Sequence, residues 1–508
     1  MVTQHDAKNR WPITISIMLA TVMNSLDTTI ANVALPHMQG SVSASPEQIT
    51  WVLTSYIVAA AIMTPLSGWL ADRIGRKRMF LISIGGFTAA SMLCGVATSL
   101  PEIVLFRVLQ GVFGAALIPL SQAVLLDINP PEKHGEAMAI WGAGAILGPV
   151  LGPALGGYFT EYFSWRWCFF INLPVGILAF LGVLFFISGD RLAKAKRFDF
   201  LGFGMLTLFI ASFQMVLDRG PSQDWFQSRE IWTETIMAAV GFWVFVIHTF
   251  TTDHPFFDKA LMRDRNFVTA NVFGFFIGIL LFSTMALLPP MMQTLMGYPV
   301  LTSGLVSMPR GVGSFVAMFF VGRLIGRVDT RLILMTGLTI SCFALWQMMN
   351  FDLSMGVWPF ISSGIIQGLG VGLLFVPLST LAFATVPPHL RPEGSSVYTL
   401  VRNLGASVGI SIMNALLVAN SQTMHAALTA KVITSDPVVR ATLPLMFDPA
   451  TAAGITSLNG EISRQASMVA YIDDFRLMFI VTVACMPMLL LMRRPRRAGG
   501  ELLHAAID

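Results

Sequence analysis

Residues 68–78 read Gly68-Trp-Leu-Ala-Asp72-Arg73-Ile-Gly75-Arg76-Lys77-Arg78 and separate two apolar runs, 47–70 and 79–98. Each run is long enough for a membrane-spanning helix, which needs about 20 apolar residues. The stretch between them carries four basic residues, and Lys and Arg collect in the cytoplasmic loops of membrane proteins. These residues therefore predict a tight turn between two spanning helices, with its basic side chains on the cytoplasmic face.

The rest of the chain repeats this pattern. It has 508 residues, of which 55% are hydrophobic and 12% charged, whereas soluble proteins carry about 25% charged residues. This composition disfavours a soluble enzyme, a nucleic-acid binder and a disordered scaffold. It predicts an all-α polytopic membrane protein with 14 transmembrane helices, over the runs 11–36, 47–70, 79–98, 101–126, 137–159, 165–187, 199–217, 231–251, 266–290, 301–322, 331–350, 357–385, 395–419 and 472–492.

The basic residues also predict the orientation of the helices. With the N-terminus inside, inner loops hold about three times as many Lys and Arg residues as outer loops, which is the bias that orients helices in a bilayer. Both termini are then expected in the cytoplasm. The net charge of +4 is accounted for by these loops, so it does not indicate a nucleic-acid partner.

Sequence matches between the two ends of the chain, at an offset of about 255 residues, predict an internal repeat. Gln110-Gly111 with Pro119-Leu120-Ser121 recurs as Gln367-Gly368 with Pro377-Leu378-Ser379. We therefore expect an N-terminal six-helix bundle over 1–190, a two-helix insertion over 191–260 and a C-terminal six-helix bundle over 261–508. Residues 420–470 are polar and are expected to form a long outer loop, either functional or disordered.

Two charges lie inside spans of the first half. Asp27 is the only acidic residue placed deep in a predicted span, where a charge costs about 3 kcal/mol or more, so it should face a cavity or a partner. Asn24 and Thr28 share its helix face. Arg107 lies at a compatible depth on the fourth helix. We hypothesise that proton binding at Asp27 weakens its attraction to Arg107 and shifts an alternating-access equilibrium. The alternatives are a static ion pair and a neutral, structural aspartate.

Further polar residues in or near spans are candidates for lining a substrate cavity, although a structural role is at least as plausible for each. They are Asn24, Thr28, Gln110, Gln122, Gln293, Arg310, Gln367, Asn403 and Asn414. In the fifth helix, Gly148, Gly152 and Gly156 recur every four residues, which lets helix backbones touch. Pro149 and Pro153 of the same helix each remove a backbone donor.

Several of these segments resemble a known family. Residues 68–78 resemble the loop 2–3 signature of the major facilitator superfamily, and 26–36 resemble the first-helix motif of its fourteen-helix drug:proton antiporters. The segment 107–111 is similar to their fourth-helix motif and 148–157 to their fifth-helix antiporter motif. Residues 217–226 are similar to the inserted helix pair of EmrB/QacA-type exporters, the EmrB-like branch in particular.

The resemblance implies the major facilitator fold, with two parallel six-helix repeats plus two inserted helices. It implies a proton-coupled exporter of hydrophobic or amphiphilic compounds in the bacterial inner membrane, with Asp27 and Arg107 in proton coupling. It also implies a charge latch between the halves, built on Gly68, Asp72, Arg73, Gly75 and Arg76. A periplasmic adaptor and an outer-membrane channel are possible partners by resemblance only.

Other functions remain open. One is a facilitator-family exporter of a specific lipid or metabolite. A membrane enzyme or sensor is disfavoured, because no HExxH zinc motif is present. No Gly-Lys pair occurs either, which excludes a Walker A loop. No cofactor or metal is expected, and the energy source is expected to be a proton gradient.

Overall fold

The computed structural model describes residues 9–491 except for 45, 50, 131–132, 189–197, 221–222, 326, 388–389, 432–443, 445–446 and 448–450. Within this part the regular structure is all helical, apart from one isolated bridge between Ile325 and Val328. Thirteen described helices are long and apolar enough to cross a membrane. A further helix, α20 (Ala452–Cys485), is 34 residues long and is not among these thirteen. The all-helical class and a count of 13 to 14 spanning helices agree with the sequence prediction.

The N-terminal half is formed by helices whose ends follow the predicted runs closely. They are α2 (Arg10–Ser41), α3 (Pro46–Ile49), α4 (Trp51–Ile74), α5 (Arg76–Val96), α6 (Leu100–Gly114), α7 (Leu117–Ile128), α8 (His134–Tyr162), α9 (Trp167–Phe170) and α10 (Asn172–Phe186). The turn between α4 and α5 depends on Gly75, whose φ of 91° favours glycine.

The predicted fourth helix is divided into α6 and α7 at Ala115 and Ala116. Beside this break, Asn24 of α2 donates its Nδ2–H to the carbonyl of Gly114, at 2.8 Å. A side chain that bonds to the backbone in this way is a common cause of a helix break.

The inserted pair and the C-terminal half complete the chain. The inserted helices are α11 (Phe200–Arg219) and α12 (Arg229–Thr251), with η3 (Trp225–Gln227) between them and α13 (Lys259–Arg263) after them. The C-terminal half comprises α14 (Arg265–Pro290), η4 (Met291–Leu295), α15 (Val300–Leu324), α16 (Thr330–Met348), α17 (Trp358–Ala384), α18 (Arg391–Lys431), α20 and η7 (Met486–Leu491). Asp199, Asp264 and Asp329 cap α11, α14 and α16 by accepting backbone N–H groups.

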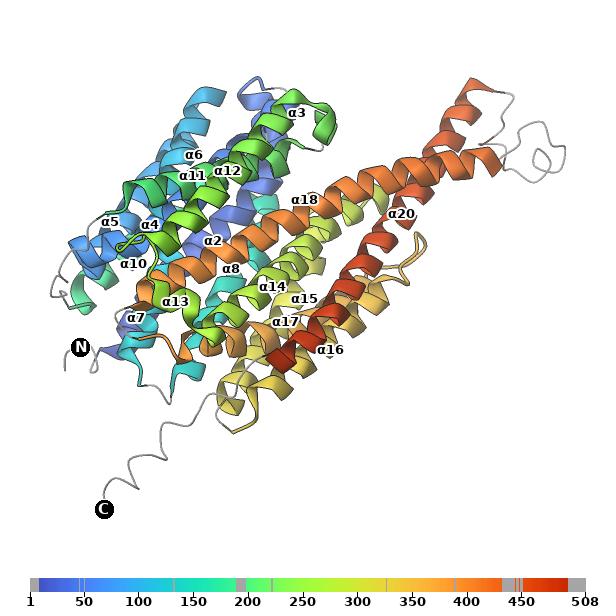
Figure 1. Ribbon diagram of the computed structural model, residues 1–508. Coiled ribbons are helices and arrows are strands. Elements are labelled where there is room, and N and C mark those ends of the chain that lie inside the picture. The colour runs from blue at the N-terminus through green and yellow to red at the C-terminus, as the bar shows by residue number, and fades with distance from the viewer. Residues whose placement is uncertain are drawn as a thin grey trace, which may run out of the picture.

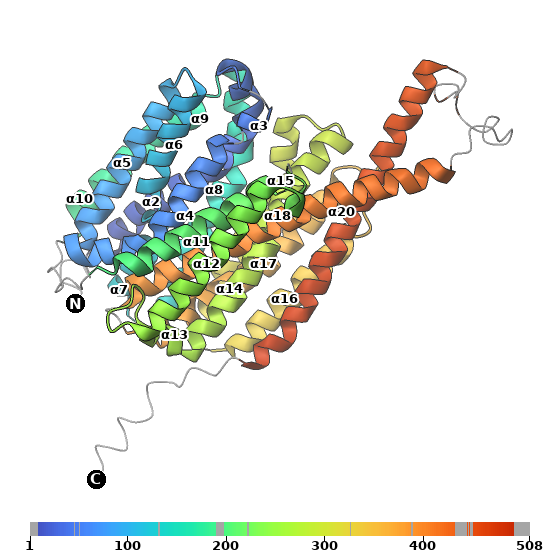
Figure 2. The ribbon, with the colours of Figure 1, turned by 45° about the horizontal axis from the view of Figure 1, so that its top comes forward.

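The two halves lie side by side and contact each other along α8 and α15, and also through α18, which packs on α4 and α7 (Figures 1 and 2). We call the end of the bundle at which α2 begins the Arg10 end, and the opposite end the Ser41 end. At the Arg10 end, Ser67 of α4 and Ser396 of α18 place their hydroxyl oxygens 3.0 Å apart. The two halves are therefore joined closely at this end.

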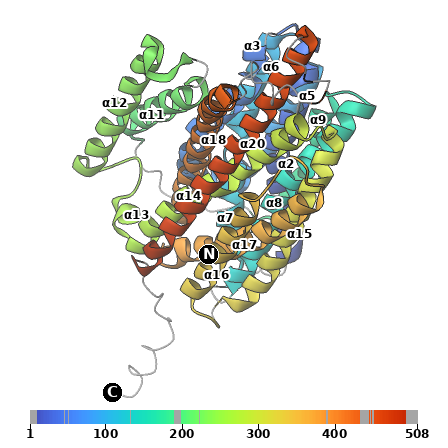
Figure 3. The same cartoon turned by 90° about the vertical axis from the view of Figure 1, so that its right-hand side faces the viewer.

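The inserted pair lies at the edge of the bundle (Figure 3), and its helix α11 contacts both halves. Asp218 of α11 accepts a hydrogen bond from Thr54 of α4, at 2.5 Å. On the other side, Ser407 of α18 donates to Gln214 Oε1, at 2.8 Å, and Ser411 donates to the carbonyl of Leu217, at 2.7 Å. Helix α11 is thus hydrogen-bonded to one helix of each half.

The segment expected as an outer loop, 420–470, is helical at both of its ends. Helix α18 continues to Lys431 and α20 begins at Ala452, so the two helices project beyond the rest of the bundle (Figures 1 and 2). Two side-chain contacts tie them together: Ser421 with Ser467 and His425 with Asn459, each at 3.0 Å. The polarity that suggested a loop belongs to helices outside the apolar bundle.

Candidate functional site

The centre of the N-terminal half contains a buried ion pair. Asp27 of α2 is 0% exposed and Arg107 of α6 is 1% exposed. Arg107 Nη1 donates to Asp27 Oδ2, at 2.6 Å. The structure thus joins the two charges that the sequence analysis singled out. Asp27 faces this partner, and not an open cavity.

Three further groups hold the pair in place. Gln110 Nε2 donates to Asp27 Oδ1, at 2.8 Å, and Gln110 Oε1 accepts from Arg107 Nη1, at 2.8 Å. Asn172 of α10 donates to the same Oδ1, at 3.0 Å, and also to Ser91 Oγ of α5, at 2.9 Å. Both carboxylate oxygens are therefore hydrogen-bonded, and the acid is joined to α6 and α10 directly and to α5 through Asn172.

The guanidinium of Arg107 is also fixed by α4. Its Nε donates to the carbonyl of Val52, at 2.9 Å, and its plane lies over the ring of Tyr56, with the guanidinium carbon 4.3 Å from the ring centre. Tyr56 in turn donates to Asn24 Oδ1, at 3.3 Å. Removing one member of such a buried pair leaves an uncompensated charge, which costs about 3–5 kcal/mol. Any change in the charge of Asp27 therefore acts on α2, α4, α6 and α10 together.

The C-terminal half has a glutamine contact that corresponds to the one between Gln110 and Asp27, but the acid is replaced by a threonine. Gln367 of α17, the repeat counterpart of Gln110, donates to Thr284 Oγ1 of α14, at 2.9 Å. Arg310 of α15 is 8% exposed, and its Nη2 donates to the carbonyl of Leu281, at 3.1 Å. The two halves share the glutamine contact, but the ion pair is present in the N-terminal half only, among the described residues.

The other cavity candidates have separate environments. Gln122 Oε1 accepts from Ser395 of α18, at 2.6 Å, so it lies between the halves. Thr28 is half-buried and donates to the carbonyl of Ser25, at 2.8 Å. Gln293 is half-buried in η4, while Asn403 and Asn414 are exposed on α18. Of the candidates, Asn24 and Gln110 belong to the Asp27 network.

The loop 2–3 residues lie at the Arg10 end, where the halves meet. A Cβ on Gly68 would lie 3.1 Å from the Cα of Glu393, so a larger residue would push α18 outward by a few tenths of an ångström. Asp127 of α7 forms ion pairs with Arg76 of its own half and with Arg391 of α18, the latter at 3.2 Å. Arg73 lies over the ring of Trp69, at 5.1 Å, and Asp72 lies in the last turn of the same helix α4, which ends at Ile74. Asp127 and Arg391 form an inter-half ion pair that the sequence analysis did not predict.

The glycines of α8 allow two close helix contacts. A Cβ on Gly148 would meet the backbone carbonyl carbon of Ser25, and one on Gly152 would meet Thr29 Oγ1, so both pack against α2. Pro153 and Ala154 touch Gly304 of α15. Gly156 is buried, and the side chain of Pro149 lies outside the described part. Helix α8 therefore packs against its own half and the opposite half at once.

Among the polar groups that the structure buries, the sequence analysis missed Asn172 and Asp474. Asn172 carries no charge and lies within the predicted apolar run 165–187, so no charge drew attention to it. Asp474 of α20 is 1% exposed, and neither carboxylate oxygen has a hydrogen-bond partner among the described residues. Asp474 follows the polar segment 452–471, which placed it at the edge of a predicted span.

Comparisons with known proteins agree on one family. The family model described as Major Facilitator Superfamily matches residues 17–410. The chain is 34% identical over 500 residues to the multidrug export protein EmrB of Escherichia coli (strain K12), covering 96% of each chain. It is 32% identical over 492 residues to the fatty acid resistance protein FarB of Neisseria gonorrhoeae, covering 96% of this chain and 97% of that protein.

Solved structures share the fold at low sequence identity. The chain matches the proton:xylose symporter XylE with a TM-score of 0.61 and 13% identity, covering 95% of this chain and 97% of that one. It matches the human organic anion transporter MFSD10 with a TM-score of 0.60 and 14% identity, covering 93% and 99%. These matches support the helical architecture alone.

Proposed function

The chain belongs to the Major Facilitator Superfamily, and from this premise we propose that it exports hydrophobic or amphiphilic compounds in exchange for protons, by alternating access. It is a multi-pass membrane transporter related to EmrB exporters. The buried Asp27–Arg107 pair is the observation that supports the exchange for protons. A titratable acid inside an apolar bundle is the group through which a proton gradient can act.

Proton binding at Asp27 would neutralise the carboxylate and leave the cation of Arg107 without its counter-charge. Gln110 and Asn172 would then lose an anionic acceptor, so the contacts of α2 with α6 and α10 weaken together. A proton that favours one arrangement of these helices over another shifts the population of access states. Asp27 therefore couples the proton to the conformational change.

The contacts at the Arg10 end would hold one access state. With the loop 2–3 residues in the cytoplasm, as the distribution of Lys and Arg predicts, the closed Arg10 end faces the cytoplasm. Opening this end must break the contacts of Asp127 with Arg391 and of Ser67 with Ser396. We assign the described arrangement to a state closed toward the cytoplasm, with both termini on that side.

A specific lipid or fatty-acid exporter is the second candidate function. The similarity to FarB, named a fatty acid resistance protein, favours it. A periplasmic adaptor and an outer-membrane channel would be the partners of a bacterial inner-membrane exporter of this kind. The projecting ends of α18 and α20 and the α11–α12 pair offer surfaces for such a partner.

Transport into inverted membrane vesicles tests the proposal. With no membrane potential imposed, the wild-type chain should accumulate a fluorescent amphiphile only when a pH gradient is present. Asp27→Asn cannot release a proton, so it should lose gradient-driven accumulation by more than tenfold while still reaching the membrane in normal amounts. Gradient-driven transport at the wild-type level in this variant would disprove the coupling role of Asp27. A matched control is Asp224→Asn, because Asp224 lies in the connection between α11 and α12, outside the network.

A further inference from the structure

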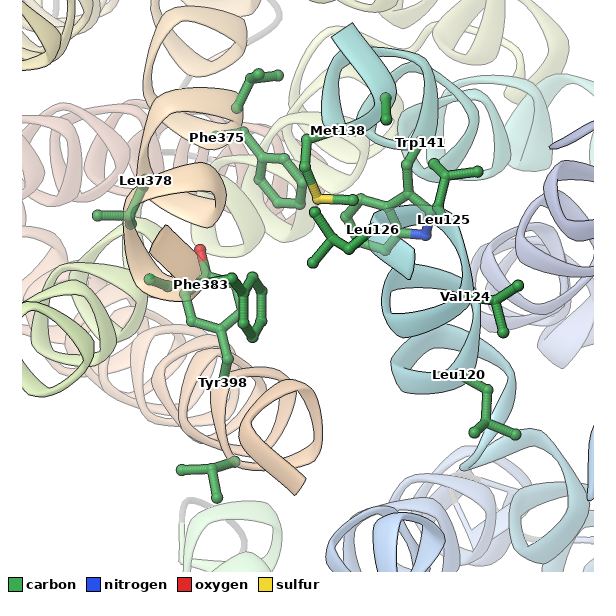
Figure 4. Packing of buried hydrophobic residues seen from close by; sticks show 14 of the residues in the cluster. Leu120, Val124, Leu125, Leu126, Met138, Trp141, Phe375, Leu378, Phe383 and Tyr398 are labelled. Atoms are coloured by element: carbon green, nitrogen blue, oxygen red, sulfur yellow. The ribbon is translucent and has the colours of Figure 1, made fainter. Parts of the chain in front are cut away.

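A buried cation lies between the two halves, outside the Asp27 network. Arg402 of α18 is 6% exposed. Its guanidinium carbon is 5.4 Å from the centre of the Phe375 ring of α17. Phe375 stacks on Trp141 of α8, with ring centres 5.6 Å apart and an interplanar angle of 14° (Figure 4). Arg402 therefore adjoins an aromatic pair in which each half supplies one ring.

Arg402 has no counter-charge in the part of the chain that the structure describes. No described carboxylate forms an ion pair with it, and its Nε is buried without a hydrogen-bond acceptor. An uncompensated buried charge is costly. The buried charge of Arg107, by contrast, is compensated by the carboxylate of Asp27. Arg310 differs as well, because its Nη2 has the carbonyl of Leu281 as an acceptor.

Two neighbouring polar groups are also left without partners. Thr399 lies one turn before Arg402 on the same helix face, and its Oγ1 is buried and unpaired. Gln122 of α7 accepts from Ser395 through Oε1, which leaves its Nε2–H₂ group buried without an acceptor. Gln122 contacts α18 at Ser395, which lies on the same helix face as Thr399 and Arg402, so a guanidinium, a hydroxyl and an amide with N–H or O–H groups to donate follow one another along α18.

We propose that this cluster binds the anionic group of the transported substrate, and that the Trp141–Phe375 pair contacts its apolar body. The proposal rests on the proposed export function and specifies its substrate class as amphiphilic organic anions, carboxylates in particular. The planar fork of an arginine matches the two oxygens of a carboxylate. Because Arg402 and Gln122 come from opposite halves, a bound anion would contact both of them.

Equilibrium binding to the purified full-length chain in lipid nanodiscs tests the proposal at neutral pH. The probes are pyrenebutyrate and its neutral amide, which have the same ring and chain. The wild type should bind the acid about tenfold or more tightly than the amide, as expected for a charged hydrogen bond. Arg402→Gln should bring the two affinities together. Arg402→Lys keeps the charge but loses the fork, so it should retain part of the preference.

A matched control is Arg323→Gln. Arg323 also lies over a phenylalanine ring, that of Phe319, at 3.7 Å, but it is exposed on α15. This variant should keep the wild-type ratio of affinities. Gln122→Leu removes the second donor at a different residue, so it should weaken binding of the acid severalfold even if Arg402→Gln fails to fold.

Three results would overturn the proposal: no saturable binding of pyrenebutyrate, equal wild-type affinities for acid and amide, or a folded Arg402→Gln variant with the wild-type preference. Transport driven by a pH gradient is measured separately on the same proteins. Acid-selective binding without gradient-driven transport would refute proton-coupled export and leave the anion site standing. Gradient-driven transport without acid preference would refute the anion site alone.

Discussion

Asp127 should control how often the Arg10 end opens. Of its two ion pairs, the one with Arg76 lies within the N-terminal half and persists in either access state, so only the one with Arg391 favours closure. The side chains of Asp127 and Arg391 are 24% and 14% exposed, and a partly screened ion pair of this kind contributes about 1 kcal/mol. Asp127→Asn should therefore raise the population of the open state about fivefold.

Labelling of a cysteine at Ser396 with a membrane-impermeant maleimide measures that population. Ser396 is 0% exposed in the closed arrangement, and all four native cysteines are buried. The labelling rate of Ser396→Cys should rise about fivefold when Asp127→Asn is added, and Arg391→Gln should have the same effect. Arg76→Gln should have a smaller effect. An unchanged rate in Asp127→Asn, or an equal rise in Arg76→Gln, would refute this reasoning.

Further predictions concern packing, ion-pair geometry and pH. Gly148→Ala should destabilise the chain by about 1–3 kcal/mol, because the new Cβ meets the α2 backbone; thermal unfolding beside Gly204→Ala, where the space is open, checks this. Arg107→Lys should lower gradient-driven transport severalfold, since an ammonium cannot replace the planar fork; vesicle uptake that equals the wild type would contradict it. The hydrogen bond from Arg464 lowers the pKa of Glu461 in the folded chain. The ion pair therefore stabilises α20 fully at a pH above the pKa that Glu461 has in the unfolded chain. This stabilisation is lost as the pH falls through the lower pKa that Glu461 has in the folded chain. Amide-exchange protection over 452–466 should therefore drop on acidification, and a pH-independent value would contradict the assignment.

The sequence predicted the membrane class and the Asp27–Arg107 contact for one physical reason. Charges are so costly in an apolar run that their positions are informative without any structure. Helix ends were predictable where basic or capping residues bound an apolar run, as at Arg76 and Asp199. The continuation of α18 to Lys431 was not predictable from apolar periodicity, because that segment is polar and still helical.

Uncharged residues explain most of what the sequence could not predict. Asn172 gave no signal before the structure placed it against Asp27, at 3.0 Å. The sequence also does not show which of two adjacent polar residues is buried. On α18, Asn403 is exposed, whereas Arg402 is buried between the halves. Both lie in one polar pair, and only the packing of α18 against its neighbours decides which of them turns inward.

The separate positions of Asp27 and Arg402 have an electrical consequence. A cycle that carries one proton inward on Asp27 and one anion outward past Arg402 moves two positive charge equivalents inward. Each charge that crosses the membrane is worth about 2.3 kcal/mol per 100 mV, so at about 100 mV the two charges would contribute about 4.6 kcal/mol, which corresponds to a substrate gradient of more than about a thousandfold. Export of an acid by this chain would be electrogenic, and it would continue on voltage alone after the pH gradient had collapsed.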